Sequence, residues 1–194
     1  MNDGQSSVNL NMLMTGNFQI FVLLRTTPTR EENDMKIYIA SSWKNYQIVR
    51  QLSHLLQAKG HEVYDFTDEK KHFAFNALDI PRFTGKSRDE IDWLEFNECR
   101  ETMMAFKTDK EGLDWADAVL MVLPCGRSAH IEAGYAVGQG KPLVIYGDLP
   151  KGEFETMYGF AFDCIRNTDS TSWDVFTLST ALEVAVARSE GGRQ

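Results

Sequence analysis

The chain has 194 residues, of which 43% are hydrophobic and 25% are charged, as is usual for a globular protein with one core. Its formal net charge of −8 argues against a nucleic-acid polymer as partner, because neutralising many phosphates requires a dominant basic face. The widely spaced cysteines include no C-x-x-C pair, so we expect neither a disulfide framework nor a zinc site, but reduced thiols in a cytoplasmic protein.

The first 34 residues are expected to lie outside the folded domain. The apolar run Phe18–Leu24 is far shorter than the ~20 residues that cross a bilayer. No Lys or Arg precedes it, as a signal peptide would require, and the polar stretch Thr26–Asp34 follows. We therefore expect residues 1–34 to be a poorly ordered extension, residues 35–194 to form a single α/β domain, and no membrane to be a partner.

From Met35 onward, short apolar runs alternate with longer stretches of helical periodicity. The expected strands are Lys36–Ala40, Glu62–Phe66, Ala118–Leu123, Pro142–Tyr146 and Phe162–Arg166. The expected helices are Trp43–Lys59, Ser87–Lys107, Ser128–Gly138 and Asp174–Arg188. This alternation predicts a doubly wound parallel sheet of about five strands with helices on both faces.

The crevice of such a sheet lies beyond the carboxyl ends of the strands, near the switch in strand order. This places the segments Ala40–Lys44, Asp65–Phe66 and Pro124–Ser128 around one ligand site. The connection from Thr67 to Trp115, after the second strand, interrupts the alternation. Because a connection of that length in a compact domain is usually functional or mobile, we expect a lid-like insertion over the crevice.

The stretch Leu123–Gly140 runs from a buried strand through a short turn into a helix of small residues. Within Ala129–Gly138 the only formally charged residue is Glu132. An acid in the first helical turn can simply complement the helix dipole. Among these small residues we favour a nucleophile that the dipole keeps ionised, since a carboxylate can attack an anomeric carbon to form a glycosyl-enzyme.

Further polar residues are expected around the same crevice. Backbone N–H groups, a guanidinium and a hydroxyl make Gly126, Arg127 and Ser128 a candidate phosphate cradle, although Ser128 can equally be a plain N-cap. Tyr38 can be ordinary strand packing, and Ser41, Ser42 and Lys44 ordinary loop residues. The acids before the third strand are turn residues by default, with a spacing that lets at least one reach a ligand: Asp109, Asp114 and Asp117.

Three of these segments resemble the nucleoside 2-deoxyribosyltransferase superfamily, in the family's order and across roughly Met35–Tyr146. They are KIYIASSW from Lys36, D-x-x-G-L-x-x-A-D-A from Asp109, and S-A-H-I-E-A-G-Y-A from Ser128. The resemblance implies a flavodoxin- or Rossmann-like fold, a retaining double displacement without a cofactor or metal, and a homo-oligomer. It further implies that Glu132 is the nucleophile, that Tyr38 orients it, and that Asp109 protonates the leaving base.

The sequence also departs from the family's pattern. Gly126 and Arg127 stand where transferases often carry a sugar-binding Asp, which is more similar to the branch that hydrolyses 5'-monophosphates. The expected activity is cleavage or transfer at the N-glycosidic bond of a (deoxy)nucleoside or nucleoside 5'-monophosphate. The alternatives are an NAD-type dinucleotide glycohydrolase and a non-catalytic nucleotide sensor. His130-x-Glu132 imitates a zinc deaminase, but the order of the motifs is reversed and the second cysteine pair is absent.

Overall fold

The computed structural model describes residues 34–68, 84–87, 89–167 and 171–191. Five strands form one parallel sheet in the order β2-β1-β3-β4-β5. They are β1 (Lys36–Ala40), β2 (Glu62–Tyr64), β3 (Ala118–Val122), β4 (Leu143–Tyr146) and β5 (Asp163–Ile165). This is the strand order of a flavodoxin-like sheet, whose switch point lies between β1 and β3, so the predicted fold class is confirmed.

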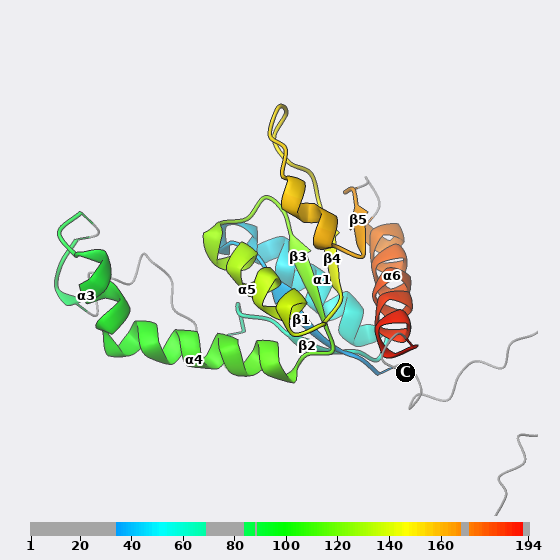
Figure 1. Ribbon diagram of the computed structural model, residues 1–194, viewed down its shortest axis with the longest axis horizontal. Helices are drawn as coiled ribbons and strands as arrows, with labels where there is room; N and C mark the ends of the chain where they lie inside the picture. Colours follow the sequence, from blue (N-terminus) through cyan, green and yellow to red (C-terminus); the bar gives the residue numbers. More distant parts are fainter. Residues whose placement is uncertain (1–33, 69–83, 88, 168–170, 192–194) are drawn as a thin grey trace, which may run out of the picture.

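Helices cover both faces of the sheet (Figure 1). On one face lie α1 (Tyr46–Ala58), which follows the short 3-10 helix η1 (Trp43–Asn45), and α6 (Thr171–Gly191). On the other face lie α5 (Arg127–Gly138) and the last turn of α4 (Arg100–Trp115). Because side chains alternate along a strand, Ile37 and Ile39 of β1 point toward α1, whereas Tyr38 points toward α4 and α5.

Helix α5 approaches the sheet closely because its buried side chains are small. Ala129, Ala133 and Ala136 form the stripe that contacts the strands, at the spacing of one helix face. With only methyl groups between the helix axis and the strands, the neighbouring positions of α5 are held near the side chains of β1. The small residues noted in the sequence thus have a packing role.

The insertion after β2 differs from the prediction of one helix over Ser87–Lys107. The structure has two helices, α3 (Trp93–Glu98) and α4, separated at Cys99, whose backbone is extended with φ −68° and ψ 143°. Helix α4 also continues to Trp115, because Gly112 and Leu113 of its last turns are buried against the sheet side of the molecule. The apolar pattern ends at Phe106, which is why the sequence predicted too short a helix.

Helix α3 and the first turns of α4 project away from the sheet (Figure 1). Residues 69–83, which belong to the predicted lid, and residues 1–33 of the predicted extension lie outside the described residues. Within the described ranges, no helix combines the length and the apolar character that crossing a bilayer requires.

Candidate active site

Two stacked tyrosines form the base of the candidate site. Tyr38 of β1 and Tyr64 of β2 are direct partners in the parallel register, and their rings stack with centroids 4.8 Å apart and planes inclined by 11°. On α4, a Cβ added to Gly112 would come within 2.5 Å of the Tyr64 ring, so only glycine permits this approach. Tyr64 is therefore packed between the Tyr38 ring and the backbone of α4.

Asp109 lies in α4, and not in a turn as the default interpretation of the sequence had it. The Tyr64 hydroxyl donates a hydrogen bond of 2.9 Å to Oδ1 of Asp109. Burial raises the pKa of Asp109 to about 6, while the hydrogen bond from Tyr64 acts in the opposite direction because it stabilises the carboxylate. The Asp109 side chain is thus an acid with a perturbed pKa, held by a buried phenol.

Glu132 lies in the second turn of α5, since this helix begins at Arg127. The Tyr38 hydroxyl lies near its carboxylate and favours the ionised form. Burial raises the pKa of Glu132 to about 8, the nearby charge of Asp109 adds to the rise, and the Tyr38 hydroxyl opposes it. The prediction that the dipole keeps Glu132 ionised is wrong, because the dipole's effect declines beyond the first turn and desolvation outweighs it here.

The two carboxyl groups form an interacting pair between α4 and α5. With pKa values of about 6 for Asp109 and about 8 for Glu132, the pair holds one proton and one negative charge between these pH values. A retaining double displacement needs one ionised carboxylate and one protonated carboxyl group. The pair provides this charge state near neutral pH, with the proton on Glu132 in the free protein.

The loops that follow β1 and β3 are joined at the switch point. Ser41 donates its hydroxyl proton to the carbonyl oxygen of Val122 over 2.9 Å. The amide of Asn45 donates to Ser41 Oγ over 3.1 Å and to the carbonyl oxygen of Pro124 over 2.8 Å. Asn45 was missed in the sequence, because a single Asn between a loop and a helix forms no pattern. These bonds fix the turn that leads into α5.

The remaining polar residues after β1 have local roles. Ser42 is the N-cap of η1, and its Oγ accepts a hydrogen bond of 3.3 Å from the Lys44 backbone N–H. The Lys44 side chain is exposed beside this loop. The ligand contacts predicted for Ser41, Ser42 and Lys44 stay predictions. The Ser41 hydroxyl proton is used in its hydrogen bond to the Val122 carbonyl oxygen.

The predicted phosphate cradle is the exposed start of α5. Gly126 is the N-cap of the helix, Arg127 its first residue, and no side chain caps this first turn. The N-cap role considered for Ser128 therefore falls to Gly126. Ser128 precedes Glu132 by four residues, so the two share a face of α5 one turn apart, about 6 Å along the axis. An anion at this terminus would lie one turn from the Glu132 carboxylate.

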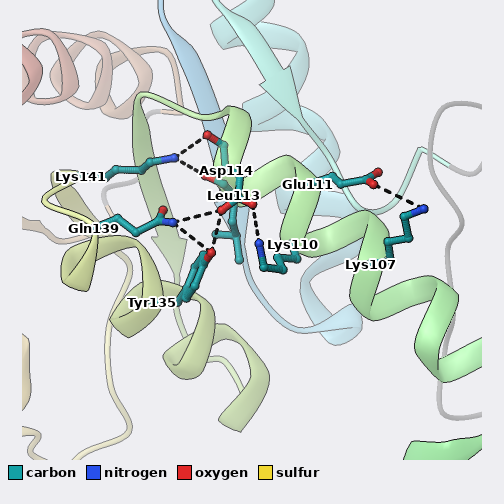
Figure 2. Close-up of polar contacts among 8 residues, drawn as sticks. All are labelled: Lys107, Lys110, Glu111, Leu113, Asp114, Tyr135, Gln139 and Lys141. Atoms are coloured by element: carbon teal, nitrogen blue, oxygen red, sulfur yellow. Dashed lines mark hydrogen bonds and ion pairs between the residues drawn. The ribbon is translucent and has the colours of Figure 1, made fainter.

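A surface network fastens α4 to α5 (Figure 2). Asp114 Oδ1 accepts hydrogen bonds from Tyr135 Oη, at 2.7 Å, and from Gln139, at 3.1 Å. Its Oδ2 accepts from Lys110 at 2.6 Å, and Lys141 donates to the backbone carbonyl oxygen of Asp114 at 2.8 Å. These bonds hold the pKa of Asp114 far below its usual range. Asp114 therefore has a structural role, and it secures the helices that carry the two site acids.

Asp117, the third acid before β3, is also structural, since its Oδ2 accepts a hydrogen bond of 2.9 Å from the Lys36 backbone N–H.

His130 lies on the opposite side of α5 from Glu132, where its Nε2 and Tyr158 Oη are 2.9 Å apart. In the described part of the chain, no group of three or more His, Cys, Asp or Glu side chains could hold a metal ion.

Two cavities lie elsewhere on the described part of the molecule, and neither is lined by Asp109 or Glu132. One, of about 190 Å³, lies on the His130 side of α5, between the loops that follow β3 and β4. The other, of about 650 Å³, is an open groove between β2 and α4, lined by Tyr64 and Gly112 among others. Sequence reasoning also missed Tyr64; the alternation of β2 would have placed it beside Tyr38 only once the two strands were known to be neighbours.

Comparison with known proteins finds no matching protein-family model and no matching curated protein. Among solved structures, the chain is similar to a 2-deoxyribosyltransferase of Bacillus psychrosaccharolyticus, with 22% identity, a TM-score of 0.41, and coverage of 62% of this chain and 77% of that one. A response regulator receiver domain of Clostridium thermocellum shows 16% identity, a TM-score of 0.46, and coverage of 80% and 97%. The CMP N-glycosidase of Clostridium botulinum shows 14% identity, a TM-score of 0.43, and coverage of 74% and 97%. Such likeness concerns the fold alone, which these proteins of different function share.

Proposed function

We propose that this protein cleaves or transfers at the N-glycosidic bond of a (deoxy)nucleoside or nucleoside 5'-monophosphate, through a covalent glycosyl intermediate on Glu132. The observation that supports this proposal is the pair of partly buried carboxyl groups, each beside its own tyrosine and both with a raised pKa, so that the pair carries one proton near neutral pH. Purely structural acids are seldom held at this protonation state, whereas catalytic acid–nucleophile pairs require it.

In the proposed reaction the sugar lies on the Ser128–Glu132 face of α5, with the 5'-phosphate at the helix N-terminus. Glu132 attacks the anomeric carbon, the bond from this carbon to the base nitrogen breaks, and its electron pair leaves with the base. Asp109 gives its proton to the departing base. In the second half, water or another base attacks the anomeric carbon, Asp109 takes up the proton of that nucleophile, and Glu132 is released.

This order of events requires the proton of the free site to move from Glu132 to Asp109 before the attack. The positive charge that develops on the sugar in the transition state stabilises the Glu132 carboxylate, so the form with the proton on Asp109 is the one that reacts. Tyr38 acts in the same direction, because it favours the ionised form. The two effects oppose the burial that keeps Glu132 protonated in the free protein.

The test is the release of free base from a panel of nucleosides, nucleoside monophosphates and NAD, followed by chromatography. Glu132→Ala should lower the rate by at least ~10³-fold, since it removes the nucleophile. Glu190→Ala, at an exposed position of α6, is the matched control and should leave the rate unchanged. A pentosyl adduct on the peptide that contains Glu132 should be seen by mass spectrometry.

Undiminished release by Glu132→Ala would refute the role of this residue. Faster release of nicotinamide from NAD than of base from any monophosphate would make the protein a dinucleotide glycohydrolase. Calorimetric binding of a nucleotide without any release of base would make it a sensor.

We also propose that the protein forms a homo-oligomer through the projecting arm, defined as α3 and the first turns of α4. Large apolar side chains of the arm are exposed: Trp93, Leu94, Met103, Met104 and Phe106. A monomer rarely leaves so many on one projecting element. Acids predominate at the start of the arm, with Asp92, Glu95 and Glu98, and Lys107 follows Phe106. A second copy packed antiparallel would therefore bring opposite charges together.

The test of this second proposal is the mass in solution, measured by light scattering after size-exclusion chromatography. The wild-type chain should have a multiple of its 22.1 kDa mass, and Phe106→Glu should shift it toward the monomer. Phe154→Glu, at a loop phenylalanine that is 91% exposed elsewhere on the molecule, is the control. A wild-type protein that is monomeric at high concentration would refute the proposal.

A further inference from the structure

We infer that Tyr64 is a positioning residue of this site, which fixes Asp109 so that only its Oδ2 is left to exchange a proton with the leaving base. The inference rests on the proposed function for the identity of the reaction. Its structural part, the control of Asp109 by Tyr64, can be tested without any substrate.

The Tyr64 side chain is confined by the Tyr38 ring and by α4. The stacked ring of Tyr38 lies against one side, with centroids 4.8 Å apart, and α4 approaches so closely at Gly112 that a Cβ there would be 2.5 Å from the ring. Only 5% of Tyr64 is exposed. Its hydroxyl therefore has a fixed place, and Asp109 is the group that is held by it.

The hydrogen bond assigns different roles to the two oxygens of Asp109. Tyr64 has one hydroxyl proton, and it is donated to Oδ1 over 2.9 Å. A proton bound to Oδ1 would compete with that bond, so the acidic proton belongs on Oδ2. Because Tyr38 lies near Glu132 and favours its ionised form, each carboxyl group has its own neighbouring phenol. The proposed acid, Asp109, and the proposed nucleophile, Glu132, thus each interact with a different tyrosine.

The charges around Asp109 come from every neighbouring element. Glu132 faces it from α5, Tyr64 from β2 and Tyr38 from β1, while Glu111 of α4 interacts with Tyr64. Among these neighbours, the Tyr64 hydroxyl is the one that lowers the pKa of Asp109, against the burial that raises it. Removing this hydroxyl should therefore raise the pKa of Asp109.

The experiment compares the wild-type chain with Tyr64→Phe, which keeps the ring and removes only the hydroxyl. Titration of the aspartate carboxyl carbons by NMR, with Asp109 assigned from Asp109→Asn, should show its pKa about 1 unit higher in the variant. This is the size expected for the loss of one hydrogen bond to a charged group. In the base-release assay, the acidic limb of kcat/KM should move upward by the same amount, and kcat should fall about 10-fold while KM stays nearly constant.

Tyr146→Phe is the matched control, because it removes another buried tyrosine hydroxyl that donates to an aspartate, Asp174 Oδ2, over 2.8 Å. This pair lies on the α6 side of the sheet, so its loss should leave the titration of Asp109 and the pH profile unchanged. Circular dichroism would show whether each variant folds. If Tyr64→Phe does not fold, Gly112→Ala takes its place, since the added Cβ displaces the Tyr64 ring without removing its hydroxyl.

An unchanged titration of Asp109 in a folded Tyr64→Phe or Gly112→Ala variant would overturn the inference. An equal shift in Tyr146→Phe would overturn it as well, because it would show a general effect of weakened folding. Failure of the wild-type protein to release any base would refute the proposed function alone, since the NMR titration would still decide the role of Tyr64.

Discussion

Replacing Glu132 by glutamine should stabilise the fold, and by an amount that grows with pH. The pKa of this carboxyl group is raised from 4.5 to about 8 in the folded protein. A carboxyl group with a higher pKa in the folded than in the unfolded state favours folding only while it is protonated. Its contribution is complete below pH 4.5 and is lost as the pH rises toward 8.

The size of the effect follows from about 1.4 kcal/mol for each pKa unit. The free energy of unfolding of the wild-type chain should be about 3 kcal/mol lower at pH 7 than at pH 4.5, because folding disfavours the charged form of Glu132 over this whole range. Glutamine has a similar shape and never ionises, so Glu132→Gln avoids this loss. The difference in free energy of unfolding between Glu132→Gln and the wild type should therefore be about 3 kcal/mol larger at pH 7 than at pH 4.5.

Urea unfolding followed by circular dichroism at several pH values between 4.5 and 8 would measure the free energy of unfolding. Glu190→Gln, at an exposed glutamate of α6, serves as the control and should follow the wild type at every pH. A difference between Glu132→Gln and the wild type that stays constant with pH would refute the reasoning. It would mean that Glu132 is not desolvated in the folded chain.

Three further predictions concern the neighbouring residues. Asp109→Asn should slow base release by about 10²- to 10⁴-fold, and much less for a substrate whose leaving group needs no proton, as compared by absorbance assays. Arg127→Ala should raise KM for a nucleoside 5'-monophosphate but not for the free nucleoside, as measured by initial rates; equal changes for both would exclude a phosphate contact. Asp114→Ala should lower the Tm and speed amide exchange in the last turns of α4, because the bonds to Tyr135, Gln139 and Lys110 are lost; unchanged exchange would contradict a fastening role.

The alternation of apolar runs and helical periodicity was sufficient to predict the architecture. Each predicted strand is present, although all except Lys36–Ala40 are one or two residues shorter than predicted. The order of the strands could not be predicted from the hydrophobic pattern. The pattern shows which face of the sheet a side chain lies on, but not which strand lies beside it. Tyr64 was missed for this reason. Its importance depends on β2 lying next to β1, where the register places it against Tyr38.

The sequence predicted which residues belong to the candidate site better than it predicted their charge states. Glu132, Tyr38 and Asp109 lie near enough to influence one another's pKa, and the roles that the resemblance implies for them stay predictions. The expectation of an ionised Glu132 failed because desolvation depends on what surrounds a side chain in three dimensions. In the same way, the hydroxyl of Ser41 looked available in the sequence, and only the structure shows that it is donated to Val122.

The alanine stripe of α5 has a consequence for changing this protein by design. Because Ala129, Ala133 and Ala136 set the gap between the helix and the strands, exchanging one of them for a larger residue would lift Glu132 away from the phenol of Tyr38. The distance between Glu132 and Tyr38 is thus set by the side of α5 that faces the sheet. A graded series of substitutions there, from alanine to serine to valine, would vary this distance while Glu132, Tyr38 and Asp109 are kept.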